Sequence, residues 1–302
     1  MNHFISCDWG TTSFRIRLVQ LPEMQIVSSL HQNDIGFGQI TLKRDEKISL
    51  LQQKIDALLA RRAPGEAIPC ILSGMASSSI GISELPYGKL PISLKAFALP
   101  YEKLDKNIFL VSGLADEEDV MRGEEVQIAG AVNKASGSEK NTLVILPGTH
   151  SKHALIQGKE LVSFQTFLSG ELFSILLKHS ILKHSFPDEE KEQVDITAFQ
   201  RGIAASSGYL LHELFAIRAR QVLGNEPQLA KQDFLSGLLI GAELRGLPQE
   251  KFTEALVVAD GKLSQLYQAA IRALYPKLTI RLFSTEQATI LGHFQLIENL
   301  KV

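Results

Sequence analysis

The chain runs twice through one plan of secondary structure, and this repetition constrains its fold more than any single motif does. In the first half, alternating apolar residues predict strands at 3–9 and 14–20 around a tight turn, and a third strand at 25–31. The second half repeats the order strand, turn, strand, strand between residues 142 and 166. The repetition is one of architecture, not of sequence. It predicts two α/β domains with a cleft between them.

After each of these meanders, helices are expected to alternate with strands. The first half carries a predicted helix at 46–62, strands at 67–72 and 107–112, and a helix at about 124–134. The polar stretch at 135–141 is the expected junction, which gives domains at 1–138 and 139–302. The later predicted elements are helices at 170–183, 195–224, 231–245, 262–274 and from 285, and strands at 255–259 and 278–283.

Composition and missing motifs exclude several classes of partner and of enzyme. The chain has 302 residues, enough for two packed domains, and a net charge of −2, which attracts neither nucleic acid nor an anionic membrane. Cys7 and Cys70 lack metal-type spacing and fit a reduced compartment. No basic leader and no apolar run of about 20 residues is found, so we expect a cytoplasmic protein. Motifs of P-loop kinases, Rossmann dehydrogenases, α/β-hydrolases and zinc enzymes are also missing from the sequence.

The strongest local motif surrounds the first predicted turn. Asp8 ends the first strand, where its carboxylate could hold Mg²⁺. The backbone N–H groups and hydroxyls of the turn Gly10, Thr11, Thr12 and Ser13 could bind phosphate oxygens. Arg15 could neutralise charge on a transferring phosphoryl group. The alternative is a plain hairpin turn, which the motif alone does not exclude.

A second turn of this kind lies at the matching place in the second half. Gly148, Thr149 and His150 form it, and Lys152 follows. One such turn in each domain predicts two loops that hold the same polyphosphate. We favour His150 as a hydrogen-bonding turn residue over a catalytic base, and the side chain of Lys152 could equally point to solvent.

A third motif places two carboxylates at a predicted helix start. Glu124 is our candidate for the base that accepts a proton from a substrate hydroxyl, with Glu125 next. Stabilisation of the helix dipole is the alternative reading. Arg122 offers a fork of donors suited to a substrate carboxylate. Gly237 and Gly241 lie on one helical face and permit close backbone approach to a neighbouring strand or a ligand, and we take them as cofactor-binding candidates. Gly261 opens a helix after a buried strand, where an adenosine could lie, with an ordinary strand–helix turn as the alternative.

Taken together, these motifs resemble a known family. Residues 8–15 are similar to the first phosphate motif of sugar kinases in the actin, hexokinase and heat-shock ATPase superfamily. The joint set resembles the 2-dehydro-3-deoxygalactonokinase family and covers essentially the whole chain. Its members are V-M-R-G-E-E-x-Q-x-x-G-A (120–131), L-P-G-T-H-x-K (146–152), F-Q-T-F-L-S-G-E-L (164–172), A-x-R-A-x-x-V-L-G (216–224) and F-L-S-G-L-L-I-G-A-E (234–243).

This resemblance implies two ribonuclease-H-like domains, with ATP and Mg²⁺ as cofactors. It also implies phosphoryl transfer to the C6 hydroxyl of 2-keto-3-deoxy-D-galactonate in galactonate breakdown, and a sugar pocket that includes Ser73, Gly74 and Met75. Glu124 stands where related kinases carry Asp, and the second turn lacks their D-x-G form. A kinase for 2-keto-3-deoxygluconate and a non-catalytic nucleotide-binding protein stay open as alternatives. A homodimer is a reasonable expectation.

Overall fold

The computed structural model describes residues 1–60, 67–135, 141–186, 194–224, 228–247 and 252–300. The chain forms two compact units. The first comprises Met1–Glu139, Ile156–Phe164 and Phe283–Val302, and the second comprises Lys140–Leu155 and Gln165–Leu282. These units differ from the domain ranges expected from sequence in two segments, because residues 156–164 and the last helix associate with the first unit.

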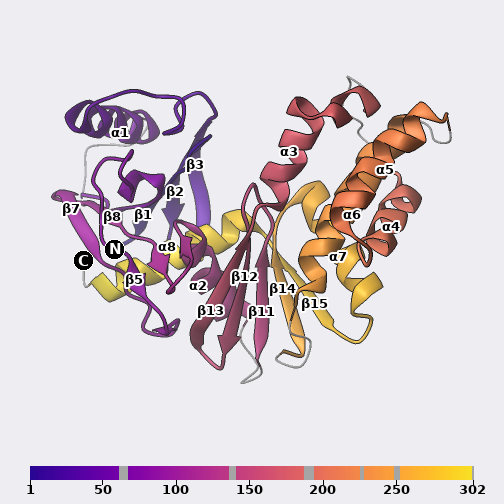
Figure 1. The fold of residues 1–302 in the computed structure, drawn as a ribbon. Helices are drawn as coiled ribbons and strands as arrows, with labels where there is room; N and C mark the ends of the chain where they lie inside the picture. Colours follow the sequence, from indigo (N-terminus) through magenta and orange to yellow (C-terminus); the bar gives the residue numbers. More distant parts are fainter. Residues whose placement is uncertain (61–66, 136–140, 187–193, 225–227, 248–251, 301–302) are drawn as a thin grey trace. The chain divides into compact units, whose positions relative to one another are not determined.

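The first unit is built on a six-stranded sheet in the order β3-β2-β1-β4-β8-β7 (Figure 1). β1 pairs antiparallel with β2, which sets Asp8 opposite Arg15. β1 also runs parallel to β4, which sets Trp9 opposite Gly74. The strands are β1 (His3–Trp9), β2 (Phe14–Gln20), β3 (Gln25–Gln32), β4 (Cys70–Gly74), β7 (Tyr101–Asp105) and β8 (Ile108–Val111).

The second unit repeats this strand order. Its sheet runs β15-β14-β11-β12-β13, so that the first strand of the meander again lies between the second strand and a crossover strand. β11 runs parallel to β14, as β1 does to β4. The architectural repeat read from the sequence is therefore confirmed. The strands are β11 (Thr142–Leu146), β12 (Ser151–Gln157), β13 (Glu160–Phe167), β14 (Glu254–Val258) and β15 (Thr279–Phe283).

The sequence did not predict β7, and it did not predict several two-residue strands, which are too brief to show a periodic pattern. One of them, β6, pairs antiparallel with the start of β13 within the first unit. The others form a small three-stranded sheet in the order β10-β9-β5. The bounds are β5 (Gly88–Lys89), β6 (Ile92–Ser93), β9 (Leu114–Ala115) and β10 (Val120–Met121).

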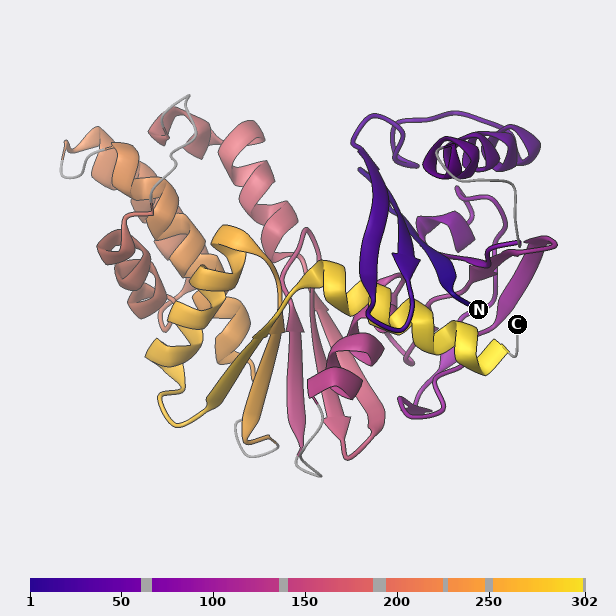
Figure 2. The same cartoon turned by 180° about the vertical axis from the view of Figure 1, so that it is seen from behind.

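The two faces of β1 contact different helices, as expected for alternating side chains. Ile5, Cys7 and Trp9 belong to the core that includes the apolar face of α1 (Arg44–Leu59). On the opposite face, Ser6 hydrogen-bonds to His293 of α8 (Thr285–Leu300), a helix clearly visible from behind in Figure 2. Helix α2 (Glu124–Ala135) packs closely on α8. Asp8 follows the register of Ser6 and so points to the face that carries α2 and α8.

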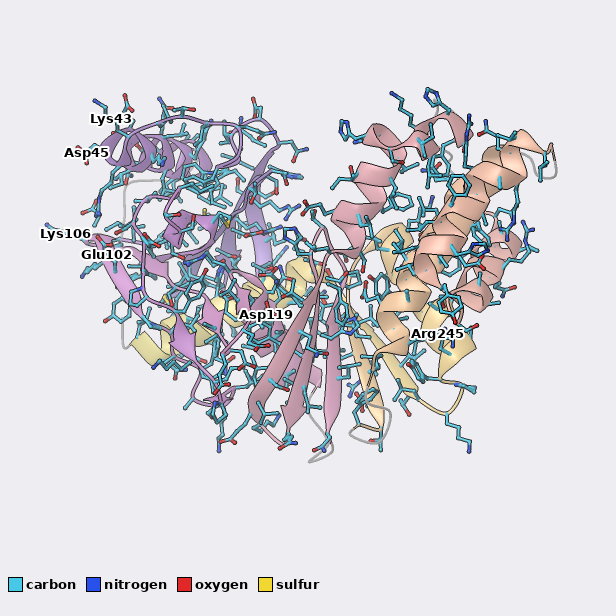
Figure 3. All side chains as sticks on the ribbon, in the orientation of Figure 1. Lys43, Asp45, Glu102, Lys106, Asp119 and Arg245 are labelled. Carbon is cyan, nitrogen blue, oxygen red and sulfur yellow. The ribbon has the colours of Figure 1, made fainter. Side chains whose placement is uncertain are left out.

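Helices of the second unit pack on its sheet and on one another. The predicted helical stretch 195–224 is divided, because a turn around Gly208 separates α4 from α5. Arg245, labelled in Figure 3 at the end of α6, donates to Ser206 Oγ at 2.8 Å and helps to hold α6 against α4. The bounds are α3 (Ser169–His179), α4 (Ile196–Ala205), α5 (Leu210–Val222), α6 (Gln228–Arg245) and α7 (Gly261–Leu274), with short 3-10 helices at Met75–Ser77 and Ile181–Ser185.

Among the helices that the structure describes, none combines the length and the apolar character needed to span a bilayer.

Candidate functional site

Asp8 and Arg15 form an ion pair at the end of the first hairpin. Arg15 Nη1 lies 3.3 Å from Asp8 Oδ2, and the Arg15 side chain is 38% exposed. Burial raises the pKa of Asp8, and the positive charges of Arg15 and Arg17 oppose that rise. A bound cation would stabilise the ionised form of the buried Asp8 carboxylate, and the partly exposed Arg15 guanidinium can contact a ligand. Asp8 lies near the end of β1 and Arg15 near the start of β2, the strand positions expected from the sequence, and their roles stay predictions.

The turn between β1 and β2 is held by a neighbouring loop through its carbonyl groups. The N–H groups of Phe37 and Gly38 donate to the carbonyls of Gly10 and Thr11 at 3.0 and 2.8 Å. Thr11 and Thr12 are exposed, whereas Ser13 is buried. Among the described residues, no acceptor for the backbone N–H of Thr11 or Thr12 is found. Backbone N–H groups without an acceptor within the protein are what a phosphate-binding turn offers to its ligand.

Two glycines bring other backbone segments against Asp8. A Cβ placed on Gly74 would lie 3.1 Å from Asp8 Oδ1 and 2.8 Å from the Trp9 carbonyl oxygen. A Cβ on Gly123 would lie 3.4 Å from Gly74 Cα and 4.0 Å from Asp8 Oδ1. Both glycines have positive φ angles, +89° and +108°, which residues with a Cβ atom rarely adopt. The ends of β1 and β4 and the start of α2 therefore converge on the Asp8 carboxylate.

The two carboxylates at the start of α2 differ in environment. Glu125 is fully buried, and its oxygens accept from the Gly123 N–H at 2.9 and 2.8 Å. Burial, with the nearby charge of Glu124, raises the pKa of Glu125 to about 8. Glu124 is half-buried, and its Oε2 accepts from the Arg122 N–H at 2.9 Å. Glu124 is therefore the carboxylate that a ligand can reach.

Arg122 is held in place by two residues that the sequence did not single out. Its Nη1 donates to the Ser77 carbonyl and, at 2.8 Å, to Ser77 Oγ. Its guanidinium carbon lies 4.2 Å from the centre of the Tyr87 ring, a cation–π contact. Within the described part of the chain, the hydrogen bonds of this guanidinium come from Nη1 alone, which leaves its other nitrogens to meet a ligand.

The structure corrects the expectation for the side chain of Ser73. Its hydroxyl is buried and hydrogen-bonds to His293 Nε2 at 2.9 Å, while Ser6 Oγ bonds to His293 Nδ1 at 2.7 Å. Burial and the charge of Arg17 lower the pKa of His293 to about 3, so this imidazole is neutral. Ser73 therefore fastens β4 to α8, and only its backbone could face a sugar. Met75, half-buried in the next turn, remains a candidate.

In the second unit, the turn before β12 packs against the start of α3. A Cβ on Gly170 would lie 2.2 Å from the Gly148 carbonyl oxygen, and the Glu171 N–H donates to the Thr149 carbonyl at 2.9 Å. His150 Nε2 lies 2.5 Å from Glu171 Oε2 at the exposed surface, in the hydrogen-bonding role favoured from sequence. Lys152 does not point to solvent. It is buried, and its Nζ donates to Thr166 Oγ1 at 2.7 Å.

A cavity of about 310 Å³ lies beside this turn, wholly within the second unit. Its polar wall includes Asp233, which is 4% exposed. Asp233 Oδ2 accepts from the Asp195 N–H at 2.8 Å, and its Oδ1 lies 4.0 Å from Lys262 Nζ. The remaining lining residues are Gly148, Ser169, Gly170, Phe173, Gln232, Ser236, Leu239, Ile240, Leu263, Leu266 and Tyr267.

The glycines expected on the adenosine side have different surroundings. A Cβ on Gly237 would lie 2.0 Å from the Phe199 carbonyl oxygen, and one on Gly241 would lie 2.5 Å from Ser206 Oγ. Both glycines therefore allow α6 to approach α4, and neither belongs to the cavity lining, so their cofactor-binding role stays a prediction. Gly261 precedes Lys262 of the lining and has a positive φ of +57° at the start of α7.

The Asp8 site suits a metal ion that arrives with a phosphate ligand. Within the described ranges, no group of three or more His, Cys, Asp and Glu side chains is arranged to hold a metal ion. Mg²⁺ is usually bound through one or two carboxylates together with substrate phosphates, not by an all-protein cage. The single carboxylate of Asp8, beside a turn with outward N–H groups, fits that donor set.

The chain is similar to known proteins over most of its length. Residues 8–296 match the family model described as 2-keto-3-deoxy-galactonokinase. The chain is 30% identical over 278 residues to the 2-dehydro-3-deoxygalactonokinase of Escherichia coli (strain K12), covering 90% of each chain. A crystal structure from Sinorhizobium meliloti, assigned as a 2-dehydro-3-deoxygalactonokinase, is similar with a TM-score of 0.82 and 27% identity, covering 99% of this chain and 96% of that one.

A more distant likeness concerns the fold alone. Component A of the (R)-2-hydroxyglutaryl-CoA dehydratase of Acidaminococcus fermentans aligns with a TM-score of 0.53 and 11% identity, covering 100% of this chain and 99% of that one. The similarity extends over the whole mixed α/β architecture.

Proposed function

This chain belongs to the 2-keto-3-deoxy-galactonokinase family, and from that premise we propose that Asp8, Arg15 and Glu124 carry its phosphoryl transfer. The enzyme is a sugar-acid kinase that uses ATP. Its proposed acceptor is the C6 hydroxyl of 2-keto-3-deoxy-D-galactonate, in galactonate breakdown in the cytoplasm. The observation that carries the residue assignment is the convergence of β1, β4 and α2 on the Asp8 carboxylate.

The first turn and Arg15 bind the transferring phosphate in this proposal. The N–H groups of Thr11 and Thr12 are directed to phosphate oxygens, and the pinned carbonyls of Gly10 and Thr11 keep the turn rigid. Arg15 stabilises the charge that spreads over the phosphoryl oxygens in the transition state. Asp8 would hold Mg²⁺, which neutralises phosphate charge when it is bound.

Glu124 would accept the proton of the acceptor hydroxyl. The hydroxyl oxygen forms a bond to the γ-phosphorus, the bond from phosphorus to the β–γ bridging oxygen breaks, and its electron pair leaves with ADP. The proton passes from the hydroxyl to a Glu124 carboxylate oxygen. Glu125 is too buried to take this role, since both of its oxygens face the Gly123 N–H.

Arg122 is proposed to bind the sugar-acid carboxylate. Contacts with Ser77 and Tyr87 already fix its guanidinium, so little side-chain freedom would be lost when a carboxylate binds. Gly74 and Met75 would contribute backbone and apolar contact beside it.

The cavity of the second unit is proposed to hold the adenosine. It is lined mostly by apolar groups, with Asp233 and Lys262 as its charged members. Asp233 is suited to accept hydrogen bonds from ribose hydroxyls. Gly148 of the second turn belongs to the same lining, so a nucleoside in the cavity would extend its phosphates toward Gly148, Thr149 and His150.

We further propose that the two units are ribonuclease-H-like domains whose phosphate turns close on one triphosphate. Their equal strand order supports this proposal, because each turn follows the first strand of its own sheet. Cysteines introduced at the exposed positions Thr11 and Thr149 would test it, with a short bis-maleimide as cross-linker. We expect cross-linking that increases with ATP and Mg²⁺, and its complete failure would contradict the shared triphosphate.

The substrate assignment is tested by ATP consumption with a panel of sugar acids. We expect turnover with 2-keto-3-deoxygalactonate, and slower turnover with its C4 epimer 2-keto-3-deoxygluconate. Faster turnover of the epimer would reassign the substrate within the same class. If no 2-keto-3-deoxy acid is phosphorylated by the folded protein, the proposed function fails.

A further inference from the structure

A chain of buried polar side chains connects the wall of the cavity with the strand that follows the second turn. Tyr267, on the cavity wall, donates its hydroxyl to Glu243 at 3.0 Å (Oε1) and 2.8 Å (Oε2). Ser151 Oγ lies 2.9 Å from the same tyrosine oxygen. Because the one hydroxyl hydrogen of Tyr267 goes to Glu243, Ser151 is left as the donor to Tyr267.

The series of hydrogen-bonded side chains ends at His153, which bonds to Glu243. His153 Nε2 lies 2.7 Å from Glu243 Oε1, and its ring packs against Phe167 with centroids 4.5 Å apart. Among the described residues, His153 Nδ1 is buried and has no hydrogen-bond partner. Ser151, His153, Glu243 and Tyr267 are all at most 4% exposed.

Each link lies on an element that shapes the proposed nucleotide site. Ser151 opens β12 directly after His150, the last residue of the second turn. Glu243 lies on α6 and Tyr267 on α7, the two helices that supply most of the cavity lining. The hydrogen bonds therefore fix the start of β12 relative to the helices that would contact the nucleoside.

This buried hydrogen-bonded network has a high cost in folding free energy if its only role is structural. Burial of a carboxylate is unfavourable unless it is well hydrogen-bonded, and apolar side chains of similar volume would pack this space at lower cost. Burial and the charge of Glu243 raise the pKa of Tyr267 well above its ordinary value, so its hydroxyl keeps the hydrogen that it donates. Apart from His153 Nδ1, the polar atoms of these four side chains are joined by hydrogen bonds, and such a buried network favours one geometry in the core.

We propose that Tyr267 and Glu243 are positioning residues for the nucleotide, and that they act through Ser151 on the turn Gly148–His150. This inference rests on the proposed nucleotide site and adds to it residues that need not touch the phosphates. The hydrogen bond from Ser151 to Tyr267 fixes the start of β12 relative to α7. In the proposal, this bond keeps the turn at a fixed distance from the α7 side of the cavity.

The test compares Tyr267→Phe with Tyr275→Phe. Tyr275 is a matched control because it is buried just after the same helix, donates its hydroxyl to the Leu244 carbonyl, and lies outside the cavity lining. Both variants lose one buried hydroxyl, and thermal unfolding of each variant measures what that loss costs in stability. We expect Tyr267→Phe alone to raise the KM for ATP about tenfold, the effect of losing a hydrogen bond to a charged group. The KM for the sugar acid should stay unchanged.

Ser151→Ala and the double variant Ser151→Ala/Tyr267→Phe test the route. If Tyr267 acts through Ser151, the double variant should raise the KM for ATP no more than the larger single change. Additive effects would overturn the route through Ser151. Equal losses of stability in Tyr267→Phe and Tyr275→Phe, with the KM for ATP unchanged in both, would overturn the positioning role.

Binding of ADP, measured by calorimetry without sugar acid, separates this inference from the proposed function. Weaker ADP binding in Tyr267→Phe but not in Tyr275→Phe supports the positioning role even if the sugar-acid assignment fails. Unchanged ADP affinity in Tyr267→Phe would count against the positioning role even if the sugar acid is phosphorylated.

Discussion

The backbone N–H of Gly123 donates to both carboxylate oxygens of Glu125, at 2.9 and 2.8 Å. This contact turns the Glu125 side chain back onto its own helix start, where it is fully buried. Its neighbour Glu124 is half-buried and open to a ligand. The two adjacent carboxylates therefore have different environments: Glu125 is turned onto the backbone at Gly123, and Glu124 is the one that we propose for proton transfer.

Glu124→Gln should remove the chemical step and leave ATP binding intact. An amide cannot accept the hydroxyl proton, and loss of a general base commonly lowers kcat by about 10²–10⁴-fold. Turnover measured with saturating sugar acid, together with ADP affinity from calorimetry, checks this prediction. Glu125→Gln is the matched comparison. A loss of kcat in Glu125→Gln and not in Glu124→Gln would show that the base is assigned to the wrong neighbour.

Glu125 should make folding stability depend on pH. Its folded-state pKa of about 8 exceeds the ordinary value of 4.5, so the folded protein keeps a proton that the unfolded chain loses between these values. Stability from this group is thus full below about pH 4.5 and is lost as pH rises toward 8. Glu125→Gln lacks this loss. Relative to the parent, its unfolding free energy should rise with pH by at most about 1.4 kcal/mol per unit.

Urea unfolding at pH 5, 6.5 and 8 measures that difference. Glu124→Gln is the comparison, because it removes the Glu124 charge that adds to the pKa shift of Glu125 and keeps the burial of Glu125, so its stability should depend on pH less steeply than that of the parent. A constant difference between Glu125→Gln and the parent across this range would show that Glu125 titrates normally.

The strands of the sheet and their turns could be predicted from the sequence because they have strong local signals. The alternation in 14–20 and the Gly and Thr residues after Asp8 determine a strand and a turn without help from distant contacts. Asp8, Arg15 and Arg122 could be singled out as site candidates for the same reason: each is a charged residue next to a recognisable break in the pattern of apolar residues.

Residues brought in from distant parts of the chain could not be found in this way. Ser77 and Tyr87 reach Arg122, and His293 reaches Ser73, only after the chain has folded. Asp233 directly precedes the motif at 234–243, but it was not singled out, because a single acid in an amphipathic helix usually faces solvent. The sequence also showed that Gly237 and Gly241 allow close approach but could not say that the neighbour is α4.

Gly237→Ala should lower stability through the contact between α6 and α4. The added methyl would meet the Phe199 carbonyl oxygen at 2.0 Å, and overpacking of this kind costs about 1–3 kcal/mol or more. Thermal unfolding measures the effect. Gly246→Ala is the matched control, because its nearest atom, the Glu243 carbonyl oxygen, lies at 3.6 Å. A normal Tm in Gly237→Ala combined with weaker ATP binding would support the cofactor role.

Asp8→Asn should abolish turnover while the protein remains folded. The ion pair with Arg15 is partly exposed, and such pairs contribute only about 0–1 kcal/mol to stability. Loss of the carboxylate removes the proposed anchor of Mg²⁺, so kcat should fall by about 10²-fold or more. Steady-state kinetics over a range of Mg²⁺ concentrations check this prediction. A kcat near that of the parent would remove Asp8 from the mechanism.

Asp233→Asn should weaken recognition of the ribose. If Asp233 accepts hydrogen bonds from ribose hydroxyls, the parent enzyme should prefer ATP to 2′-deoxy-ATP or 3′-deoxy-ATP by about tenfold in kcat/KM, the worth of one such bond to a charged group. Asn keeps the shape and can still accept from the Asp195 N–H, so the fold should be retained. The variant should discriminate between ATP and the deoxy nucleotides by less than about threefold.

Glu213→Gln controls for the loss of a negative charge in the same unit, because Glu213 pairs with Arg220 at 3.7 Å and is not part of the cavity lining. It should keep the full preference for ATP. Because Asp233 would act only on the nucleoside, the KM for the sugar acid should be equal in all three proteins. If Asp233→Asn and the parent discriminate equally between ATP and both deoxy nucleotides, the ribose lies elsewhere, since the cavity offers no second buried carboxylate among its lining residues.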